Sequence, residues 1–111
     1  MGPRATARST APDGAPLADN GAKAERIAEV LKAVAHPLRI RIVALLCQGE
    51  AHVGGLAEKL GVPQAIVSQQ LRILRLNNLV AATREDGFAR YRLAEQHLRD
   101  LVCCMERCQA R

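Results

Sequence analysis

The chain has 111 residues and a formal net charge of +5, with hydrophobic residues at 49% and aromatic residues at only 2%. Its core must therefore be aliphatic, which suits close-packed helices, and a core this small favours completion by dimerisation. No stretch approaches the roughly 20 apolar residues of a membrane span, and the amino terminus lacks the apolar centre of a signal peptide. These features exclude a membrane protein, predict a cytoplasmic one, and favour a polyanionic partner.

The first part of the chain differs in composition from the rest. Residues 1–21 are rich in Ala, Pro, Gly, Arg and Asp, with Leu17 as the only large apolar residue after Met1. Such a segment buries too little apolar surface to offset the entropy of ordering. We expect a disordered tail at 1–21 and a single folded domain at 22–111.

Two helices are predicted at the start of this domain. Apolar residues recur at helical spacing in 22–35, and His36-Pro37 ends that helix because a residue before proline is disfavoured in the α region. Residues 38–47 are apolar on most sides, which predicts a buried central helix. Arg39 at its start is either solvated or in contact with phosphate.

A helix-turn-helix follows. The short helix 54–60 is closed by Gly61, which suits a left-handed C′ position, and Pro63 suits the first turn of the next helix, 64–76. One face of that second helix is apolar. The other carries side chains that can reach base edges and phosphates: Gln64, Ala65, Ser68, Gln69 and Arg72.

A hairpin and a last helix complete the domain. Asp86-Gly87 between the alternating runs 79–84 and 88–93 is a strong hairpin signal. The last helix, 94–108, has an apolar stripe that no later helix can cover. We expect this stripe to pack on the first helix and on the same helix of a second subunit. The fold class is thus mainly α with a small β-hairpin, a winged helix-turn-helix.

The stretches LKAVAHPLRIRIVALL, GEAHVGGLAEKLGVPQAIVSQQLRILRLNNLV and REDGFARYRL resemble the ArsR/SmtB family of bacterial winged-helix repressors, over about three-quarters of the chain. The resemblance implies five helices with the hairpin between the fourth and fifth, and a homodimer through the first and last helices. It implies double-stranded DNA as partner, with Gln64, Ala65, Ser68 and Gln69 facing the major groove. Arg84 and Arg90 would let the wing touch the DNA backbone or minor groove. Dimer symmetry then predicts an inverted-repeat operator.

The cysteines suggest what releases the repressor. Four cysteines without a secretory signal are more typical of free thiols, ligands or sensors than of disulfides. His97, Cys104 and Cys108 fall on one flank of the last helix, and Cys103 points across it. Thiolates select soft ions, so the leading prediction is a thiophilic metal or metalloid (arsenite, antimonite, cadmium or mercury) as inducer. Cys104 and Cys108 would hold it, with Cys103 or His97 assisting.

Three alternatives stay open. A branch of the same family senses persulfide or oxidants by linking a cysteine of the second helix to one of the last, and Cys47 could approach Cys104 or Cys108 in this way. The cysteines of the last helix could also be small apolar interface residues. From another class, the winged helix could be a protein-interaction module that binds no DNA, although its polar second motif helix argues against that. An enzyme is not expected, since no glycine-rich phosphate loop, paired acids or nucleophile–base set is present.

Overall fold

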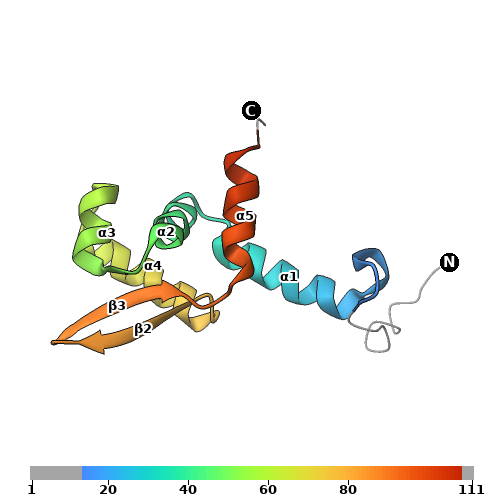
Figure 1. The fold of residues 1–111 in the computed structure, drawn as a ribbon, viewed down its shortest axis with the longest axis horizontal. Helices are drawn as coiled ribbons and strands as arrows, with labels where there is room; N and C mark the ends of the chain where they lie inside the picture. Colours follow the sequence, from blue (N-terminus) through green and yellow to red (C-terminus); the bar gives the residue numbers. More distant parts are fainter. Residues whose placement is uncertain (1–13, 109–111) are drawn as a thin grey trace. The chain divides into compact units, whose positions relative to one another are not determined.

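The computed structural model describes residues 14–108 (Figure 1). They fall into two compact units, one ending at Lys32 and the other beginning at Ala33. Over the described range, no helix is long and apolar enough to cross a membrane. The elements of the second unit match the winged helix-turn-helix expected from the sequence, so that prediction is confirmed.

The first unit contains a 3-10 turn, η2 (Leu17–Asp19), and most of helix α1 (Gly21–Val34). Asn20 caps α1, since its side-chain oxygen accepts a hydrogen bond from the Lys23 amide at 3.1 Å. The predicted helix at 22–35 is confirmed within a residue at each end. The expected disordered tail covers residues 1–21, of which 1–13 lie outside the described residues. The described remainder of this segment contains η2.

Helix α2 (Pro37–Gln48) begins at the proline that was predicted to end the preceding helix. The Nδ1 atom of His36 accepts a hydrogen bond from the Leu38 amide at 3.2 Å, so the histidine caps the helix that the proline starts. Ile42, Val43 and Leu46 are buried. The central position predicted from its apolar composition is therefore confirmed.

Helices α3 (Val53–Leu60) and α4 (Gln64–Leu76) form the helix-turn-helix. Gly61 ends α3 at φ 69°, and its amide donates to the Ala57 carbonyl at 2.8 Å. This left-handed conformation is available to glycine at little cost. The apolar face of α4 is fully buried and fixes the helix to the domain; it consists of Val67, Leu71 and Leu74.

Three antiparallel strands make the wing, in the order β1 (Ala51–His52), β3 (Phe88–Leu93), β2 (Val80–Glu85). Asp86 and Gly87 both have positive φ, as the turn of a two-residue hairpin requires. Strand β1 was not predicted. It has only two residues, which is too short for an alternating pattern to be read.

Helix α5 (His97–Glu106) is shorter than the predicted 94–108. The amides of Ala94 and Glu95 both bond to the Leu79 carbonyl, which holds this segment against the entry to β2 and delays the helix. Leu98 and Val102 are buried in the domain, whereas Leu101 and Met105 are only partly covered.

Candidate nucleic-acid interface and sensor thiols

Helix α4 presents the polar face expected from the sequence. All five of its predicted DNA-contacting residues are exposed, whereas three apolar residues of the same helix are fully buried. Amide and hydroxyl side chains at these positions can donate to and accept from base edges, and the arginine can reach phosphate. The five residues are Gln64, Ala65, Ser68, Gln69 and Arg72.

Arg39 fixes the position of α4. Its Nε atom donates to the Ala33 carbonyl at 2.6 Å, and its NH1 atom donates to the Gln70 side-chain oxygen at 2.8 Å. The side chain is half-buried. Arg39 is therefore engaged within the domain and not freely solvated, which corrects the first of the two sequence-based interpretations; a contact with phosphate stays a prediction. It links the end of α1 to the flank of the helix predicted to read DNA.

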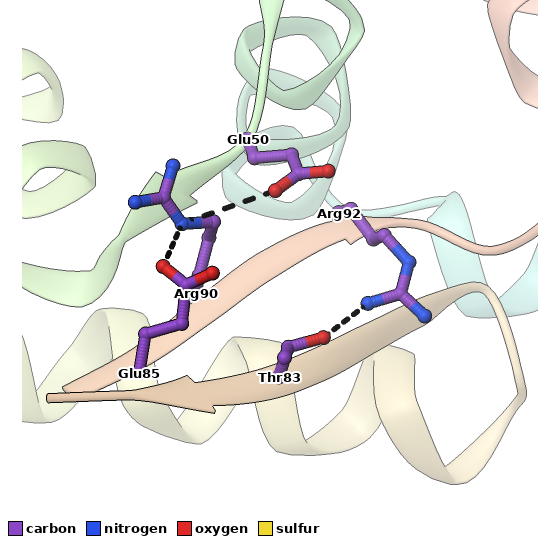
Figure 2. Close-up of polar contacts among 5 residues, drawn as sticks. All are labelled: Glu50, Thr83, Glu85, Arg90 and Arg92. Carbon is purple, nitrogen blue, oxygen red and sulfur yellow. Dashed lines mark hydrogen bonds and ion pairs between the residues drawn. The ribbon is translucent and has the colours of Figure 1, made fainter. Parts of the chain in front are cut away.

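The arginines of the wing are divided between two faces of the sheet. Along β3, Arg90 and Arg92 share one face, and Tyr91 lies on the other with Arg84 of β2, because Arg84 pairs with Ala89. Arg90 Nε lies 3.0 Å from Glu85 Oε1 and 3.9 Å from Glu50 Oε1 (Figure 2). Two carboxylates thus compensate the charge of one residue predicted to touch DNA.

The other two wing arginines have neutral partners. Arg92 NH1 donates to Thr83 Oγ1 at 2.6 Å, on the same face as Arg90 (Figure 2). Among residues 14–108, the Arg84 side chain has one hydrogen-bond partner, the Gly87 carbonyl, to which NH1 donates at 3.3 Å near the tip of the wing. Of the two wing arginines predicted to contact DNA, Arg84 is thus the one whose charge is uncompensated.

A cleft of about 500 Å3 lies between α4 and β3. Among its lining residues are Arg75 and Tyr91, which the sequence analysis did not single out. Arg75 could have been found, because it follows Ser68 and Arg72 at the spacing that keeps residues on one side of a helix. No sequence signal places Tyr91 there, since its neighbours depend on how the sheet packs against α4.

The second predicted site concerns the cysteines, and here α2 packs against α5. Arg99 NH1 donates to the Cys47 carbonyl at 2.5 Å. Burial raises the pKa of the Cys47 thiol; the Arg99 charge opposes this, and Glu106 and Cys103 add to it. Of the α5 cysteines, Cys103 is thus the one whose charge acts on half-buried Cys47. A link from Cys47 to Cys104 or Cys108 stays a prediction.

Helical spacing explains this outcome. Arg99, Cys103 and Glu106 are separated by four and three residues, so they share the side of α5 that faces α2. Arg107 NH2 also lies 3.9 Å from the Cys103 sulfur. The sequence predicts that Cys103 points across the helix from Cys104, but no sequence signal places Cys47 on that side.

The predicted metal ligands do not converge within one chain. Cys104 and Cys108 are exposed. The His97 side chain is 88% exposed and its Nδ1 atom lies 3.0 Å from Glu95 Oε2; hydrogen bonds from His97 hold the pKa of Glu95 below its usual value. In residues 14–108 no three His, Cys, Asp or Glu side chains are arranged to hold one ion. The ligand set predicted from α5 would need a second subunit.

Comparison with known proteins identifies the family. Residues 36–82 match the family described as bacterial regulatory protein, arsR family. The biofilm growth-associated repressor of Xylella fastidiosa is 38% identical over 80 residues, which is 72% of this chain and 70% of that protein. The chain belongs to the ArsR family. This ArsR-family protein is accordingly a transcriptional regulator and not an enzyme, as expected.

Solved structures agree. The transcriptional repressor BigR from Xylella fastidiosa superposes with a TM-score of 0.77 at 33% identity, over 86% of this chain and all of that one (100%). The homodimeric winged helix-turn-helix DNA-binding domain Mb0332 from Mycobacterium bovis gives a TM-score of 0.69 at 30% identity, over 86% and 87% of the two chains. The ArsR-type arrangement of helices and wing is therefore common to these proteins and this one.

Proposed function

We propose that this ArsR-family protein is a repressor that binds double-stranded DNA through α4 and the wing. The observation that carries the proposal is the exposed polar face of α4, held in place by a fully buried apolar face on the same helix. A module that bound another protein would instead expose apolar side chains there. Gln64 and Gln69 are suited to base edges, and Arg72 to phosphate.

The repressor acts as a homodimer on an inverted-repeat operator, with half-sites roughly 34 Å apart. The proposal is supported by the homodimeric state named for the Mycobacterium bovis relative. It is also supported by Leu101 and Met105 of α5, which the rest of the described chain covers only in part. The interface combines α1 and α5 of the two subunits.

Titration of DNA at several salt concentrations tests this function. Arg72→Ala should weaken binding to every sequence and flatten the slope of log K against log salt by up to about one. Gln69→Ala should instead relax the preference for the protein's own promoter over unrelated DNA. A wild-type protein without salt-dependent DNA binding would refute the assignment and favour a protein-interaction module.

We further propose that a thiol reaction between Cys47 and Cys103 releases the DNA. A peroxide oxidises the exposed Cys103 thiol to a sulfenic acid and leaves as water. The Cys47 thiol then attacks that sulfur, a second water leaves, and a disulfide joins α2 to α5. A polysulfide can replace the peroxide: Cys103 takes its terminal sulfur and the shortened polysulfide leaves. The Cys47 thiol then attacks the Cys103 sulfur, hydrogen sulfide leaves, and the same disulfide forms. The packing of α2 against α5 and the electrostatic effect of Cys103 on Cys47 support this pair over a link to Cys104 or Cys108.

A thiophilic metal or metalloid is the second candidate inducer. It is favoured by the exposure of Cys104 and Cys108 one helical turn apart on α5, a spacing at which two thiolates can grip one soft ion. A third ligand would come from His97 or from the other subunit. Arsenite, antimonite, cadmium and mercury are the ions of this class.

Serine substitutions separate the two triggers in a DNA-release assay. The thiol mechanism predicts that Cys103→Ser and Cys47→Ser resist peroxide and polysulfide, with the Cys47–Cys103 cross-link visible by mass spectrometry in the wild type. The metal mechanism predicts that Cys104→Ser loses the response to arsenite or cadmium while Cys47→Ser keeps it. If none of these variants changes release, neither trigger is correct.

A further inference from the structure

We propose that the cleft between α4 and β3, here called the α4–β3 cleft, binds one phosphate of the DNA backbone. The cleft measures about 500 Å3. This inference rests on the proposed DNA-binding function and adds the residues that anchor the duplex beside the reading face. The lining residues are Ser68, Arg72, Arg75, Leu76 and Tyr91.

The donors in the cleft match a phosphate group. Ser68, Arg72 and Arg75 are separated by four and three residues, so they line the same side of α4. Two guanidinium groups there can each present paired N–H donors to phosphate oxygens. The Ser68 hydroxyl and the Tyr91 phenol add neutral donors from α4 and β3. No carboxylate lines the cleft, so an anion meets no like charge among these residues.

The two guanidinium groups are unengaged. Across residues 14–108, no side-chain hydrogen bond or ion pair engages the guanidinium of Arg72 or Arg75, whereas the nearby Arg39, Arg90 and Arg92 each have side-chain partners. An arginine that already pairs with a carboxylate, as Arg90 does, has part of its charge compensated before it meets DNA. Arg72 and Arg75 can bind phosphate without giving up a side-chain partner, which sets them apart from Arg39, Arg90 and Arg92.

The cleft also continues the surface that faces DNA. Ser68 and Arg72 belong both to the cleft and to the outward polar face of α4. Tyr91 of β3 and Arg84 of β2 lie on the same face of the sheet, because side chains alternate between the two faces along each strand. This face is the one that lies toward α4. A DNA strand that passes the cleft therefore meets Arg84 farther along the wing. Arg90 and Arg92, on the opposite face (Figure 2), take no part in this path.

A backbone phosphate has no sequence, so the test uses a duplex of about 30 base pairs of arbitrary sequence alongside the protein's own promoter. We expect Arg75→Ala to weaken binding to both about tenfold, the effect of one charge-assisted hydrogen bond. The double variant Arg72→Ala/Arg75→Ala should flatten the salt slope by about one, since one phosphate is lost. Tyr91→Phe should weaken both about three- to tenfold with an unchanged slope.

Arg92→Ala is the matched control, because it removes an arginine from the other face of the same sheet and should leave the slope unchanged. A slope change of about two in the double variant would overturn the assignment to a single phosphate. If these variants bind DNA like the wild type, the proposal that the cleft binds phosphate is wrong. A wild type without salt-dependent binding would instead refute the DNA-binding function itself.

A second arm addresses free anions, which share the chemistry of the backbone phosphate. Millimolar inorganic phosphate, titrated without DNA and followed by the Tyr91 ring signals in NMR, should leave these signals unchanged. Saturable shifts that Arg75→Ala abolishes, together with unaltered DNA binding by that variant, would mean that the cleft is a small-anion site and would overturn the proposal.

Discussion

Arg39 provides the most direct test of how α4 is held in place. Its guanidinium joins the Ala33 carbonyl to the Gln70 side chain of α4. Hydrogen bonds to a charged group contribute about 1.5–3 kcal/mol each when well buried, and the half-buried position reduces this. We expect Arg39→Ala to lower the free energy of unfolding by about 1–2 kcal/mol in total. For a domain of this size, that lowers Tm by roughly 5–15 °C.

Thermal unfolding followed by circular dichroism, at fixed protein concentration, measures this loss. Arg92→Ala is the control, because its exposed bond to Thr83 should contribute less than about 0.5 kcal/mol. Arg39→Lys should restore only part of the stability, since one ammonium group lacks the fixed fork that reaches both acceptors. A variant Arg39→Ala with wild-type Tm but a flatter salt slope would show that Arg39 contacts phosphate and refute the reasoning.

Three further outcomes follow from burial and backbone geometry. Burial raises the pKa of the Cys47 thiol, so iodoacetamide at pH 8 should modify Cys47 more slowly than the exposed cysteines of α5. The rate at Cys47 should rise as the pH increases toward that pKa. Equal rates at all four cysteines in the native protein would contradict this. Leu71→Ala should cost about 2–5 kcal/mol in urea unfolding, whereas Leu76→Ala, at a position 74% exposed, should change stability little. Gly61→Ala should destabilise by about 1–2 kcal/mol because φ is 69°, whereas Gly55→Ala in helical, open surroundings should stabilise by about 0.5–1 kcal/mol; the reverse order in thermal unfolding would disprove the conformational argument.

Local patterns were enough to predict most elements. The spacing of apolar residues in α1 and α4 reports which side is buried, and the proline before α2 and the glycine after α3 mark boundaries by their backbone preferences. The hairpin follows from Asp86 and Gly87, which accept positive φ. Each of these signals depends on residues close together in the chain.

The features that the sequence did not predict depend on distant partners. The hydrogen-bond partner of the Cys47 carbonyl is Arg99, 52 positions later, and this contact follows from the rotation of α5 against α2. Arg39 could not be assigned a partner without knowing that Gln70 lies beside it. The compensation of Arg90 by Glu50 likewise needs β1, a strand too short to be recognised. The sequence alone shows the chemical character of each side chain, whereas these pairings can be seen only in the packed structure.

The two residues of β1 have a consequence for any attempt to re-engineer the wing. Ala51 pairs with Tyr91 and His52 with Arg90, directly before the first turn of α3. An insertion or deletion of one residue in β3 would exchange its two faces and shift the pairing between β1 and β3. The hairpin cannot then be grafted between relatives as an independent cassette; it has to be transplanted together with the junction that precedes α3.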